Sequence, residues 1–389
     1  MVDTKKLYDE FPYEKSFTAT VLSCEEIKNK KEKVTGYAVV LDQTLFFPEE
    51  GGQSCDRGIL DGFEVSDVQI RKAVITHVVA GALEVGSVVS GKIDWDFRFS
   101  NMQNHTGEHI LSGLIHRKYG YNNVGFHLSE SEVTMDMDGV VSSEALAEIE
   151  REANGAVWAN IPVSCTYPSK DVLKDLDYRS KIEIDGPVRI VEVPGFDLCA
   201  CCAPHVAATG EIGLIKILKC INYKGGIRLT IACGKRAFEA LSGAFATETA
   251  LGQLLSVKPF EITDRVNALQ TEIFNLRTQI AGIQREAVEK KAALVKEGAP
   301  NAFFFEKDLD TDAQRDFVNL LKDKVSGCAG VFVGDDESGW KYIIGSNSVD
   351  SREVNNVLRA SFAARGGGKP QMVQGSCTGT KEEILASLS

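Results

Sequence analysis

The pattern of apolar and polar positions changes along the chain, which begins with a β-rich stretch. Residues 17–92 contain short runs of β-branched residues separated by Gly, Asp and Lys, with no helical period between them. Such runs predict strands, and several strands without intervening helices are typical of a small barrel or sandwich. The clearest runs span residues 16–27, 36–47, 73–81 and 86–94. We therefore expect a small N-terminal β-barrel.

From about residue 93 the apolar period becomes helical and then alternates with strands. Five residues fall near one broad helical face: Met102, His105, His109, Leu111 and Ile115. Gly120 follows a basic last turn and is a stop signal for this helix. A second helix is expected in residues 142–160, with Ser143 as its N-cap. Strands are expected at residues 131–138, 162–168, 187–193, 213–223 and 226–234. Helices mixed with an antiparallel sheet predict an α+β domain.

The next segment carries a heptad pattern. Its apolar positions are Ile262, Val266, Leu269, Ile273, Leu276, Ile280, Ile283 and Ala287. From Val266 onward the steps alternate between three and four residues, which is typical of a coiled-coil seam. Two structures fit this seam: an antiparallel helical hairpin with residues 236–256, broken at Pro259, or a homodimer through residues 262–290. The sequence leaves both open.

The last part of the chain predicts an α/β unit. Helices are expected at residues 312–324 and 351–363, and a glycine-rich stretch follows at 365–377. The whole pattern predicts an α+β multidomain chain. Its expected parts are a β-barrel domain (1–92), an α+β domain (93–245), a helical or coiled-coil linker (246–298) and a C-terminal α/β domain (299–389).

Composition limits which cellular compartment and which kinds of partner are compatible with the chain. The N-terminus is charged and no apolar run approaches the roughly 20 residues that span a bilayer, so we expect a cytoplasmic protein with no membrane partner. The net charge of −12 argues against non-specific coating of nucleic acid, although a local basic surface could still grip a few phosphates. Ten cysteines in 389 residues are not a disulfide framework, so clustered thiols predict metal ligands before bridges.

Two histidines four residues apart lie on the first expected helix. His105 and His109 would face the same side, with β-carbons about 6 Å apart, which suits two imidazoles on one metal ion. Their spacing matches the helix of zinc proteases, but Glu108 precedes the second histidine instead of following the first. Alone, such a pair is also compatible with a solvent-exposed surface.

A thiol cluster supplies the other half of a possible site. The stretch LCACCAPHV, residues 198–206, holds Cys199, Cys201, Cys202 and His205. By itself it fits a redox pair, a closed structural zinc knot or half of a catalytic metal site. Cys201 and His205 flank a Pro-stiffened turn. With the histidine pair they make a set of three imidazoles and one thiolate, which suits tetrahedral zinc. Three of the chain's six histidines fall in these two motifs.

These motifs resemble a known family. NHTGEHILSGLI (104–115) followed by CCAPHVAATGEIGLIKIL (201–218) resembles the HxxxH…CxxxH signature of alanyl-tRNA editing domains, which occur in alanyl-tRNA synthetases and in free-standing AlaX proteins. LDQTLFFPEEGGQSCDRGIL (41–60) resembles the family's Thr-x-Phe-Tyr-Pro…Gly-Gly-Gln…Asp-x-Gly segment. GGGKPQMVQGS (366–376) resembles the glycine-rich motif of the synthetase's C-terminal domain. Three separated regions match in order, so the chain is similar to the long form of AlaX.

Three departures from the family pattern accompany the resemblance. Phe47 replaces the family's Tyr, and Glu50 fills the variable position that is often Gly. In the second metal motif, Cys-Cys-Ala-Pro-His at residues 201–205 replaces the synthetase's Cys-Gly-Gly-Thr-His. The ligand types and their spacing are kept, whereas the flexibility of the loop is not, so the departures put loop contacts in doubt and leave zinc binding intact.

The resemblance implies a zinc-containing editing domain with one Zn2+ per chain. The metal ligands that it implies are His105, His109, Cys201 and His205. Four protein ligands leave open whether the zinc activates water or only positions the substrate. Glu108 is a candidate to polarise water and is otherwise an ordinary helix carboxylate.

Other residues are candidates for contact with the substrate. Thr44 would hydrogen bond a serine hydroxyl, or is an exposed strand residue. Gly51 and Gly52 permit close backbone approach to the substrate. Gln53 could then reach the pocket that Thr44 lines, where it would bind substrate or take part in catalysis. His127 touches the substrate or is a hydrogen-bonded structural histidine.

The glycine-rich run is the candidate tRNA-binding segment. Its residues are Arg365, Gly366, Gly367, Gly368 and Lys369. Glycines let backbone N–H groups approach a phosphate or nucleobase, and the two cations add charge. The alternative is a flexible surface loop.

The resemblance implies a trans-editing hydrolase. Its substrate would be alanine tRNA, tRNA(Ala), mischarged with serine or glycine, and its reaction would be zinc-assisted hydrolysis of the aminoacyl ester. Two alternatives belong to other classes: a non-catalytic RNA-binding or regulatory protein with a structural zinc, and a general metallohydrolase acting on small esters or amides. The intact ligand motifs favour the first function, and the C-terminal glycine-rich domain favours a large RNA substrate.

Overall fold

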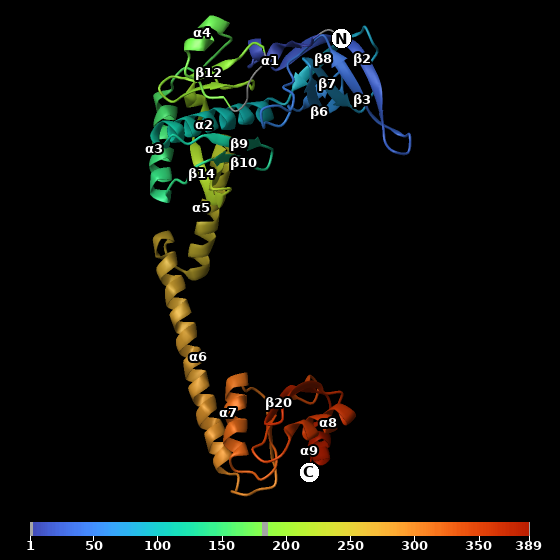
Figure 1. The fold of residues 1–389 in the computed structure, drawn as a ribbon, viewed down its shortest axis with the longest axis vertical. Helices are drawn as coiled ribbons and strands as arrows, with labels where there is room; N and C mark the ends of the chain where they lie inside the picture. Colours follow the sequence, from blue (N-terminus) through green and yellow to red (C-terminus); the bar gives the residue numbers. More distant parts are fainter. Residues whose placement is uncertain (1–2, 181–185, 389) are drawn as a thin grey trace. The chain divides into compact units, whose positions relative to one another are not determined.

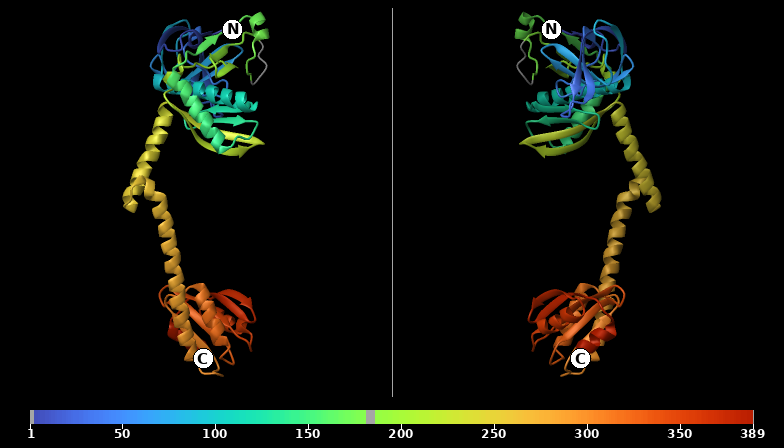
Figure 2. Two further views of the ribbon diagram at one scale, coloured as in Figure 1. Left: turned by 90° about the vertical axis from the view of Figure 1, so that its left-hand side faces the viewer. Right: turned by 90° about the vertical axis from the view of Figure 1, so that its right-hand side faces the viewer.

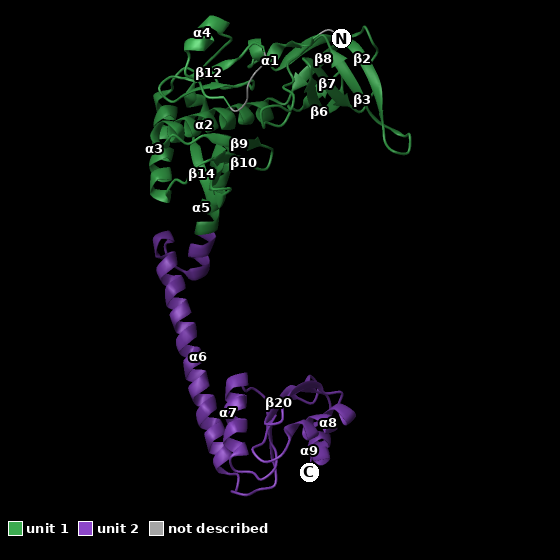
Figure 3. Ribbon diagram, in the orientation of Figure 1, with its two compact units in different colours: residues 1–248 green, residues 249–389 purple. Residues whose placement is uncertain are grey.

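The computed structural model describes residues 3–180 and 186–388, which divide into two compact units, residues 1–248 and 249–389 (Figure 3). Both units combine helices with β-sheets, so the predicted α+β multidomain class is confirmed. The finer division into four parts stays a prediction. None of the described helices has the length and apolar character needed to cross a membrane.

Unit 1 begins with a closed barrel of antiparallel strands in the order β2-β3-β7-β6-β5-β8 (Figure 1). The barrel strands are β2 (Ser16–Lys28), β3 (Val34–Leu41), β5 (Gly58–Leu60), β6 (Phe63–Arg71), β7 (Val74–Val79) and β8 (Val88–Ile93). Beside them, β1 (Lys5–Lys6) pairs in parallel with β4 (Gln43–Thr44), and α1 (Leu7–Glu10) follows β1. Buried apolar side chains, Val39, Val68 and Ile75 among them, fill the barrel.

Two features of the barrel differ from the pattern. Residues 36–47 were expected as one strand, but β3 ends at Leu41 because Asp42 turns the chain: its carboxylate accepts from the backbone N–H of Thr20 at 2.8 Å. The strands β5 and β6 were not expected. A register shift between Val65 and Asp67 interrupts the two-residue period of β6, so its apolar positions do not alternate regularly.

The rest of unit 1 is an α+β layer built around one long helix, α2 (Trp95–Tyr119). The other elements are β9 (Asn123–Leu128), β10 (Val133–Met137), α3 (Ser143–Ala159), β11 (Ser164–Thr166), α4 (Lys170–Asp175), β12 (Ile190–Val193), β13 (Asp197–Ala200), the 3-10 helix η1 (Thr209–Ile212), β14 (Ile215–Tyr223), β15 (Gly226–Cys233) and α5 (Lys235–Leu255). The strands form a four-stranded sheet, β14-β15-β10-β9, and a three-stranded sheet, β11-β12-β13.

Helix α2 is buried on all sides, which corrects the expectation of a single buried face. Every residue from Ser100 to Ile115 is buried, because α2 lies against α3, β9, β13 and β15. The predicted end is confirmed: Gly120 caps the helix with φ of 72°. The N-cap expected for the second helix is wrong by one residue, since the hydroxyl of Ser142, not Ser143, accepts from the backbone N–H of Ala145.

Unit 2 holds a long helix and an α/β domain. Its elements are the 3-10 helix η2 (Pro259–Glu261), α6 (Ile262–Ala293), β16 (Ala302–Glu306), α7 (Thr311–Lys322), β17 (Ala329–Asp335), β18 (Gly339–Gly345), α8 (Ser351–Ser361), β19 (Arg365–Lys369), β20 (Met372–Cys377) and α9 (Lys381–Leu388). The sheet order is β16-β17-β18-β20-β19. Helix α6 is continuous, and its C-terminal end packs beside α7 (Figure 2).

Candidate metal centre

Four side chains from two distant segments meet inside unit 1. Helix α2 supplies His105 and His109, and the loop after β13 supplies Cys201 and His205. One potential ligand atom from each residue lies within 4.8 Å of the other three. Each histidine is only 3% exposed, so the alternative of a solvent-exposed histidine pair is wrong. The arrangement brings together all four predicted ligands.

Each histidine of the cluster is oriented by an acceptor at its Nδ1 atom. The pairs are His105 with Gln53 Oε1 (2.8 Å), His109 with Asp197 Oδ2 (2.7 Å) and His205 with Thr106 Oγ1 (3.0 Å). The Thr106 hydroxyl itself donates to the carbonyl of Met102, so it accepts from His205. An Nδ1 that donates leaves Nε2 with a free lone pair, which is the tautomer that binds a metal ion.

The thiol of Cys201 lies between the Nε2 atoms. Its Sγ is 3.5 Å from Nε2 of His105 and 3.4 Å from Nε2 of His205. Burial opposes ionisation of this thiol, but the imidazoles of His105 and His205 outweigh it and hold the pKa of Cys201 well below its usual range. A thiol that ionises readily beside three imidazole rings is a donor set for a metal ion, which takes the place of the ring protons.

The loop that carries Cys201 is fixed by a buried cation. The guanidinium of Arg189, on the strand side of the loop, donates to the carbonyls of Cys201 at 3.0 Å and Ala203 at 2.8 Å. The backbone N–H of Cys201 donates back to the carbonyl of Arg189. The backbone of Cys201 is therefore held in place by hydrogen bonds within the protein.

Asp197 is a residue of the candidate centre that the sequence pattern did not identify. It is buried on β13 and accepts from His109 Nδ1 through Oδ2 and from Arg179 Nε through Oδ1, each at 2.7 Å. Burial alone would raise the pKa of this carboxyl. The hydrogen bonds from His109 and Arg179 lower the pKa by more than burial raises it, so the carboxyl stays ionised. The same carboxylate raises the pKa of His109 against the effect of burial.

The GGQ turn forms one wall of the centre. Gly51 and Gly52 have φ of 64° and 84°, the left-handed region that favours glycine. A Cβ on Gly52 would lie 2.3 Å from the carbonyl oxygen of Phe126, so the turn packs directly on β9. Backbone hydrogen bonds with Leu128 fix it there. This docking carries Gln53, which is fully buried, to the ring of His105.

The side-chain amide of Gln53 has one end in use and one end free. Because Oε1 accepts from His105, the Nε2 group is left as a donor, and it has no hydrogen-bond partner among the described residues. Buried donors are normally paired. Gln53 therefore has a donor available to a bound molecule next to the metal ligands.

A buried ion pair joins the barrel to α2. The guanidinium of Arg98 and the carboxylate of Asp56 are both fully buried and hydrogen bonded, with Nε 3.0 Å from each carboxylate oxygen. Asp56 also accepts from the backbone N–H of Phe47 at 2.7 Å. The Asp of the Asp-x-Gly segment thus fixes the barrel against the start of the helix that carries the histidines.

Thr44 lies in the interior of the protein, so the alternative of an exposed strand residue is wrong. Its hydroxyl is 2.9 Å from Nε2 of His77 and accepts from the backbone N–H of Phe46 at 3.0 Å. His77 Nδ1 faces the carbonyl of Val39, so the Thr44 hydroxyl donates to Nε2. Burial lowers the pKa of His77 to about 4 and keeps it neutral. The contact of Thr44 with substrate stays a prediction.

The two remaining candidates near the centre have different environments. Glu108 is buried on α2, and its carboxylate accepts a short hydrogen bond from the side chain of Asn123. His127 is exposed on β9 and lies opposite Thr134 in the sheet register. Neither belongs to the cluster of ligand atoms, and their roles stay predictions.

The neighbouring thiols differ from Cys201. Burial raises the pKa of Cys199 to about 11, so it is a neutral thiol, and it lies beside Asp197 and His109. Burial, and then the charges of Cys201 and Glu50, also raise the pKa of Cys202 above its usual range. No disulfide joins cysteines among the described residues. Of the three thiols in the motif, Cys201 is the one with the electrostatics of a ligand.

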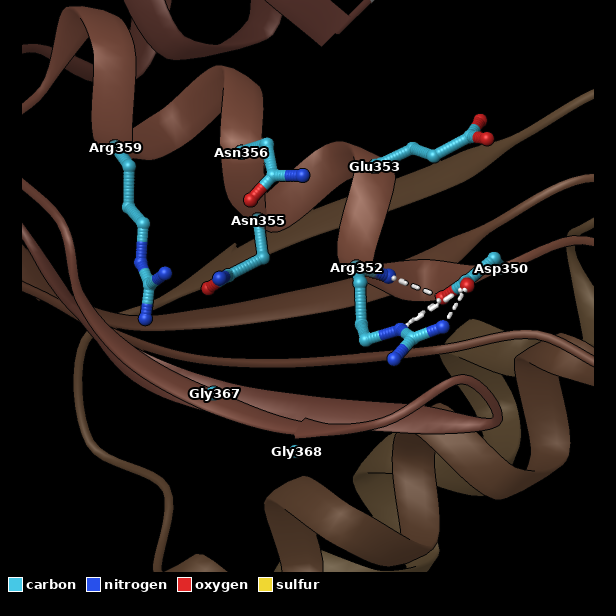
Figure 4. Close-up of a pocket in the computed structure, with 8 residues that line it drawn as sticks. All are labelled: Asp350, Arg352, Glu353, Asn355, Asn356, Arg359, Gly367 and Gly368. Carbon is cyan, nitrogen blue, oxygen red and sulfur yellow. Dashed lines mark hydrogen bonds and ion pairs between the residues drawn. The ribbon is translucent and has the colours of Figure 1, made fainter.

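The glycine-rich run forms the edge strand β19, so the alternative of a loop is wrong. A Cβ on Gly366 or Gly368 would lie 2.2 Å from a carbonyl oxygen of β20, whereas at Gly367 only Arg359 Nη2 comes within 4 Å, at 3.9 Å. The open glycine faces a cavity of about 430 Å³ between α8 and β19 (Figure 4). The cavity is lined by Asp350, Arg352, Glu353, Asn355, Asn356, Arg359, Gly367 and Gly368.

Two family models match parts of the chain. The model described as tRNA synthetases class II (A) matches residues 1–97, and the model described as Threonyl and Alanyl tRNA synthetase second additional domain matches residues 188–229. The second range contains Cys201 and His205.

Curated relatives match most of the chain. An alanyl-tRNA editing protein Aarsd1-A of Xenopus laevis is 30% identical and covers 79% of this chain and 77% of its own length. Alanyl-tRNA editing protein Aarsd1 of Danio rerio is 29% identical, with 93% and 91% covered. Alanyl-tRNA editing protein AlaX-L of Pyrococcus horikoshii is 27% identical, with 98% and 96% covered.

Proposed function

The chain belongs to the family of alanyl-tRNA editing proteins, and from that premise we propose that it is a trans-editing deacylase for alanine tRNA mischarged with serine or glycine. The reaction is attack of water on the ester carbonyl carbon, which releases the free amino acid and intact tRNA. The observation that carries the proposal is the convergence of three imidazole Nε2 lone pairs and one thiolate in a buried site.

Zinc is the metal that this donor set suits. A tetrahedral site with Zn–N of about 2.0 Å and Zn–S of about 2.3 Å has N···S edges of about 3.5 Å. The separations of 3.5 Å and 3.4 Å from Cys201 Sγ to the two Nε2 atoms match this edge. Three nitrogen donors and one sulfur donor also suit the borderline softness of zinc. We therefore propose one Zn2+ per chain, held by His105, His109, Cys201 and His205.

The proposed metal ion, Gln53 and Glu108 have different roles in hydrolysis of the ester. When bound, zinc supplies Lewis-acid polarisation of a carbonyl or an acidified water. Gln53 is placed to donate from Nε2 to the oxygen on which charge develops, because that amide group lies next to His105 with no other partner among the described residues. Glu108 is the proposed general base, and its carboxylate accepts a hydrogen bond from the side chain of Asn123.

Rejection of correctly charged alanine requires a group that recognises a hydroxyl. A site built to hydrogen bond the serine hydroxyl leaves a polar group unpaired when alanine binds, and such sites discriminate strongly. Thr44 is the proposed residue. Its hydroxyl donates to His77 and accepts one N–H, so it has one lone pair left for a donor. His127 is proposed to contact the tRNA end from the exposed face of β9.

The C-terminal domain is proposed to bind the tRNA. Arg365 and Lys369 are exposed at the two ends of β19. Between them Gly367 leaves backbone open beside the side chain of Arg359, as Figure 4 shows. A flat base or a phosphate fits such a surface, because guanidinium groups pair with phosphates and stack on bases. Gly366 and Gly368 serve the packing of β19 on β20.

The seam on α6 is compatible with the homodimer expected through residues 262–290. Val266, Ile273 and Ile283 are exposed, and apolar side chains at heptad spacing favour a second helix on this face. The homodimer, the alternative hairpin and the cytoplasmic location stay predictions.

The proposed function is tested by deacylation of three substrates. The purified protein, loaded with zinc, is incubated with alanine tRNA charged with serine, glycine or alanine. We expect seryl-tRNA and glycyl-tRNA to be hydrolysed and alanyl-tRNA to be spared by about 100-fold or more. His105→Ala removes one ligand and is expected to abolish hydrolysis. His116→Ala, a partly buried histidine on the same helix outside the cluster, is the matched control.

Two results would count against the deacylase. A folded His105→Ala protein that lacks zinc and still hydrolyses seryl-tRNA at the wild-type rate would exclude the metal centre from the reaction. A zinc-loaded wild-type protein that binds tRNA and hydrolyses none of the three substrates would favour the non-catalytic RNA-binding protein with a structural zinc.

A further inference from the structure

Five buried polar atoms in the segments around Tyr8 and Glu50 have no hydrogen-bond partner among the described residues: Tyr8 Oη, Asp9 Oδ1, Glu50 Oε2, Gln53 Nε2 and Ser54 Oγ. Tyr8 is 1% exposed and Gln53 is fully buried. Buried polar groups in folded proteins are almost always paired with protein or with an ordered ligand or water. Tyr8 Oη, Glu50 Oε2 and Gln53 Nε2 are therefore candidates to bind a further molecule.

Tyr8 and Glu50 lie beside Cys202, in the loop that carries the candidate thiolate ligand. The thiol of Cys202 hydrogen bonds the Glu50 carboxylate, and a Cβ on Gly51 would lie 3.5 Å from Cys202 Sγ. Tyr8 lies on α1, where burial and then the charges of Asp9, Glu50 and Cys202 raise its pKa. The phenol therefore stays neutral beside the carboxylate of Glu50, and Glu50 contacts Cys202, the residue after the candidate ligand Cys201.

The two carboxylates of this cluster differ in how their charge is balanced. Asp9 Oδ1 is 3.6 Å from Arg189 Nε, and its Oδ2 accepts from the hydroxyl of Tyr167 at 2.8 Å. Glu50 forms no ion pair with a lysine, arginine or histidine among the described residues. A half-buried carboxylate without a cation is costly unless a cation binds it. Among Tyr8, Asp9, Glu50 and Cys202, Glu50 is therefore the group that would be stabilised by a positively charged ligand.

The pattern of the three atoms specifies the chemistry of the ligand. Gln53 Nε2 is a donor and requires an acceptor, whereas Glu50 Oε2 is an acceptor that favours a cationic donor. The phenol of Tyr8 completes the cation's hydrogen bonds. An α-aminoacyl ester carries both matching groups one carbon apart: a carbonyl oxygen and an α-ammonium.

We propose that Glu50, assisted by Tyr8, binds the α-ammonium of the aminoacyl group while Gln53 donates to its ester carbonyl oxygen. The inference rests on the proposed deacylase function and deepens it. It makes the free amino group a determinant of recognition, so that esters without it are hydrolysed more slowly. It also gives a role to the glutamate that fills the variable position of the GGQ segment.

The test compares two esters that differ only at the α position. Nitrous acid converts seryl-tRNA into the corresponding glyceroyl-tRNA, in which a hydroxyl replaces the α-ammonium. We expect zinc-loaded wild-type protein to hydrolyse seryl-tRNA about 10- to 100-fold faster than glyceroyl-tRNA, the range of one charge-assisted hydrogen bond. Glu50→Gln keeps the shape and removes the charge. It is expected to lose this preference by slowing seryl-tRNA while leaving the glyceroyl-tRNA rate unchanged.

The neighbouring carboxylate provides the matched control. Glu49 is exposed and accepts from Gln69 on the barrel surface at 3.0 Å. Glu49→Gln removes the same charge from the adjacent residue, and we expect it to keep both rates. Hydrolysis of glyceroyl-tRNA by Glu50→Gln serves as the internal proof of folding and of metal loading.

The outcomes separate this inference from the function on which it rests. If wild-type protein hydrolyses seryl-tRNA but Glu50→Gln keeps the full preference, or slows both esters equally, the ammonium contact is wrong and the deacylase stands. If wild-type protein hydrolyses neither ester, the proposed function fails and the inference fails with it.

Discussion

The histidines of the metal centre are oriented by three different kinds of acceptor: an amide, a carboxylate and a hydroxyl. Among these, the contact of Asp197 with His109 is the strongest, because both groups are buried and the carboxylate is ionised. A charged acceptor at Nδ1 raises the basicity of Nε2 and fixes the ring. Arg179 in turn fixes the carboxylate. We therefore expect the affinity for metal to depend on residues that are not ligands.

We predict that Asp197→Asn lowers the affinity for zinc by about 10- to 100-fold, because the amide is a weaker acceptor and no longer balances the charge of the centre. The measurement is competition for zinc with a chromophoric chelator. Asp171→Asn on the surface of α4 is the control and should bind zinc like the wild-type protein. Equal affinity of Asp197→Asn and wild-type protein would mean that Asp197 has no part in holding the metal.

At this scale the sequence predicted which four side chains come together and missed the residues that orient them. The four ligand residues follow two local spacings, of four residues each, which a helix and a tight turn translate directly into geometry. Asp197 and His109 are 88 positions apart, and their contact depends on β13 lying against α2. No local pattern in the stretch around Asp197 indicates that packing.

The GGQ turn is the element that links the barrel to the metal centre. Gly52 combines a left-handed backbone with direct contact to the carbonyl of Phe126, and Gln53 follows it into the interior. The resemblance predicted that the glycines allow close approach. The structure shows that Gly52 approaches the protein's own strand β9, whereas the Cβ of a residue at position 51 would meet Cys202 at an ordinary distance.

We predict that Gly52→Ala destabilises the protein more than Gly62→Ala does. Both glycines have nearly the same φ, 84° and 86°, but nothing lies within 4 Å of a Cβ on Gly62. The backbone strain alone should cost about 1–2 kcal/mol at either position, and the clash at Gly52 should bring its total to about 3 kcal/mol or more. Urea denaturation measures both free energies of unfolding.

The same pair of variants also tests whether the turn positions Gln53. Gly52→Ala should slow deacylation at a temperature where it is still folded, while Gly62→Ala should keep its rate. Equal losses of stability in the two variants would contradict the close docking of the turn on β9.

Helices were predicted more accurately than barrel strands. Gly120 ended α2 as expected, because a stop signal acts locally. The barrel strands β5 and β6 were missed, since a bulge breaks the two-residue period and β5 is only three residues long. The burial of α2 on every side was also missed. The side chains of Asn104 and Gln103 hydrogen bond the backbone of segments that are distant in sequence, which a local pattern does not indicate.

On the scale of the whole molecule, the centre exists only when the first unit is folded. His109 and Cys201 are separated by 92 positions (201 − 109), and the GGQ turn reaches them from the barrel. The motifs predicted which residues belong together because their chemistry is complementary. The sequence pattern did not predict the cluster of Tyr8, Glu50 and Cys202, since α1 meets this loop only through the tertiary fold.

In the second unit, the sequence predicted where the glycine-rich run lies along the chain but did not predict its secondary structure. The glycine-rich run was expected to contact tRNA, with a surface loop as the alternative, yet it is an edge strand. Its flanking residues contain no aromatic or β-branched run, so propensity did not indicate β-structure. The run is a strand because its backbone pairs with β20.

The central claim is that a metal centre containing Cys201 hydrolyses mischarged tRNA, and one paired measurement tests it most directly. Zinc content and the rate of seryl-tRNA deacylation are determined in parallel for Cys201→Ser and Cys199→Ser, which alter two thiols on the same segment. We predict that Cys201→Ser loses both the zinc and at least about 100-fold of the rate, because a neutral hydroxyl replaces a thiolate ligand. Cys199→Ser should retain one zinc per chain and most of the rate. A Cys201→Ser protein with full zinc content and full activity would contradict the account.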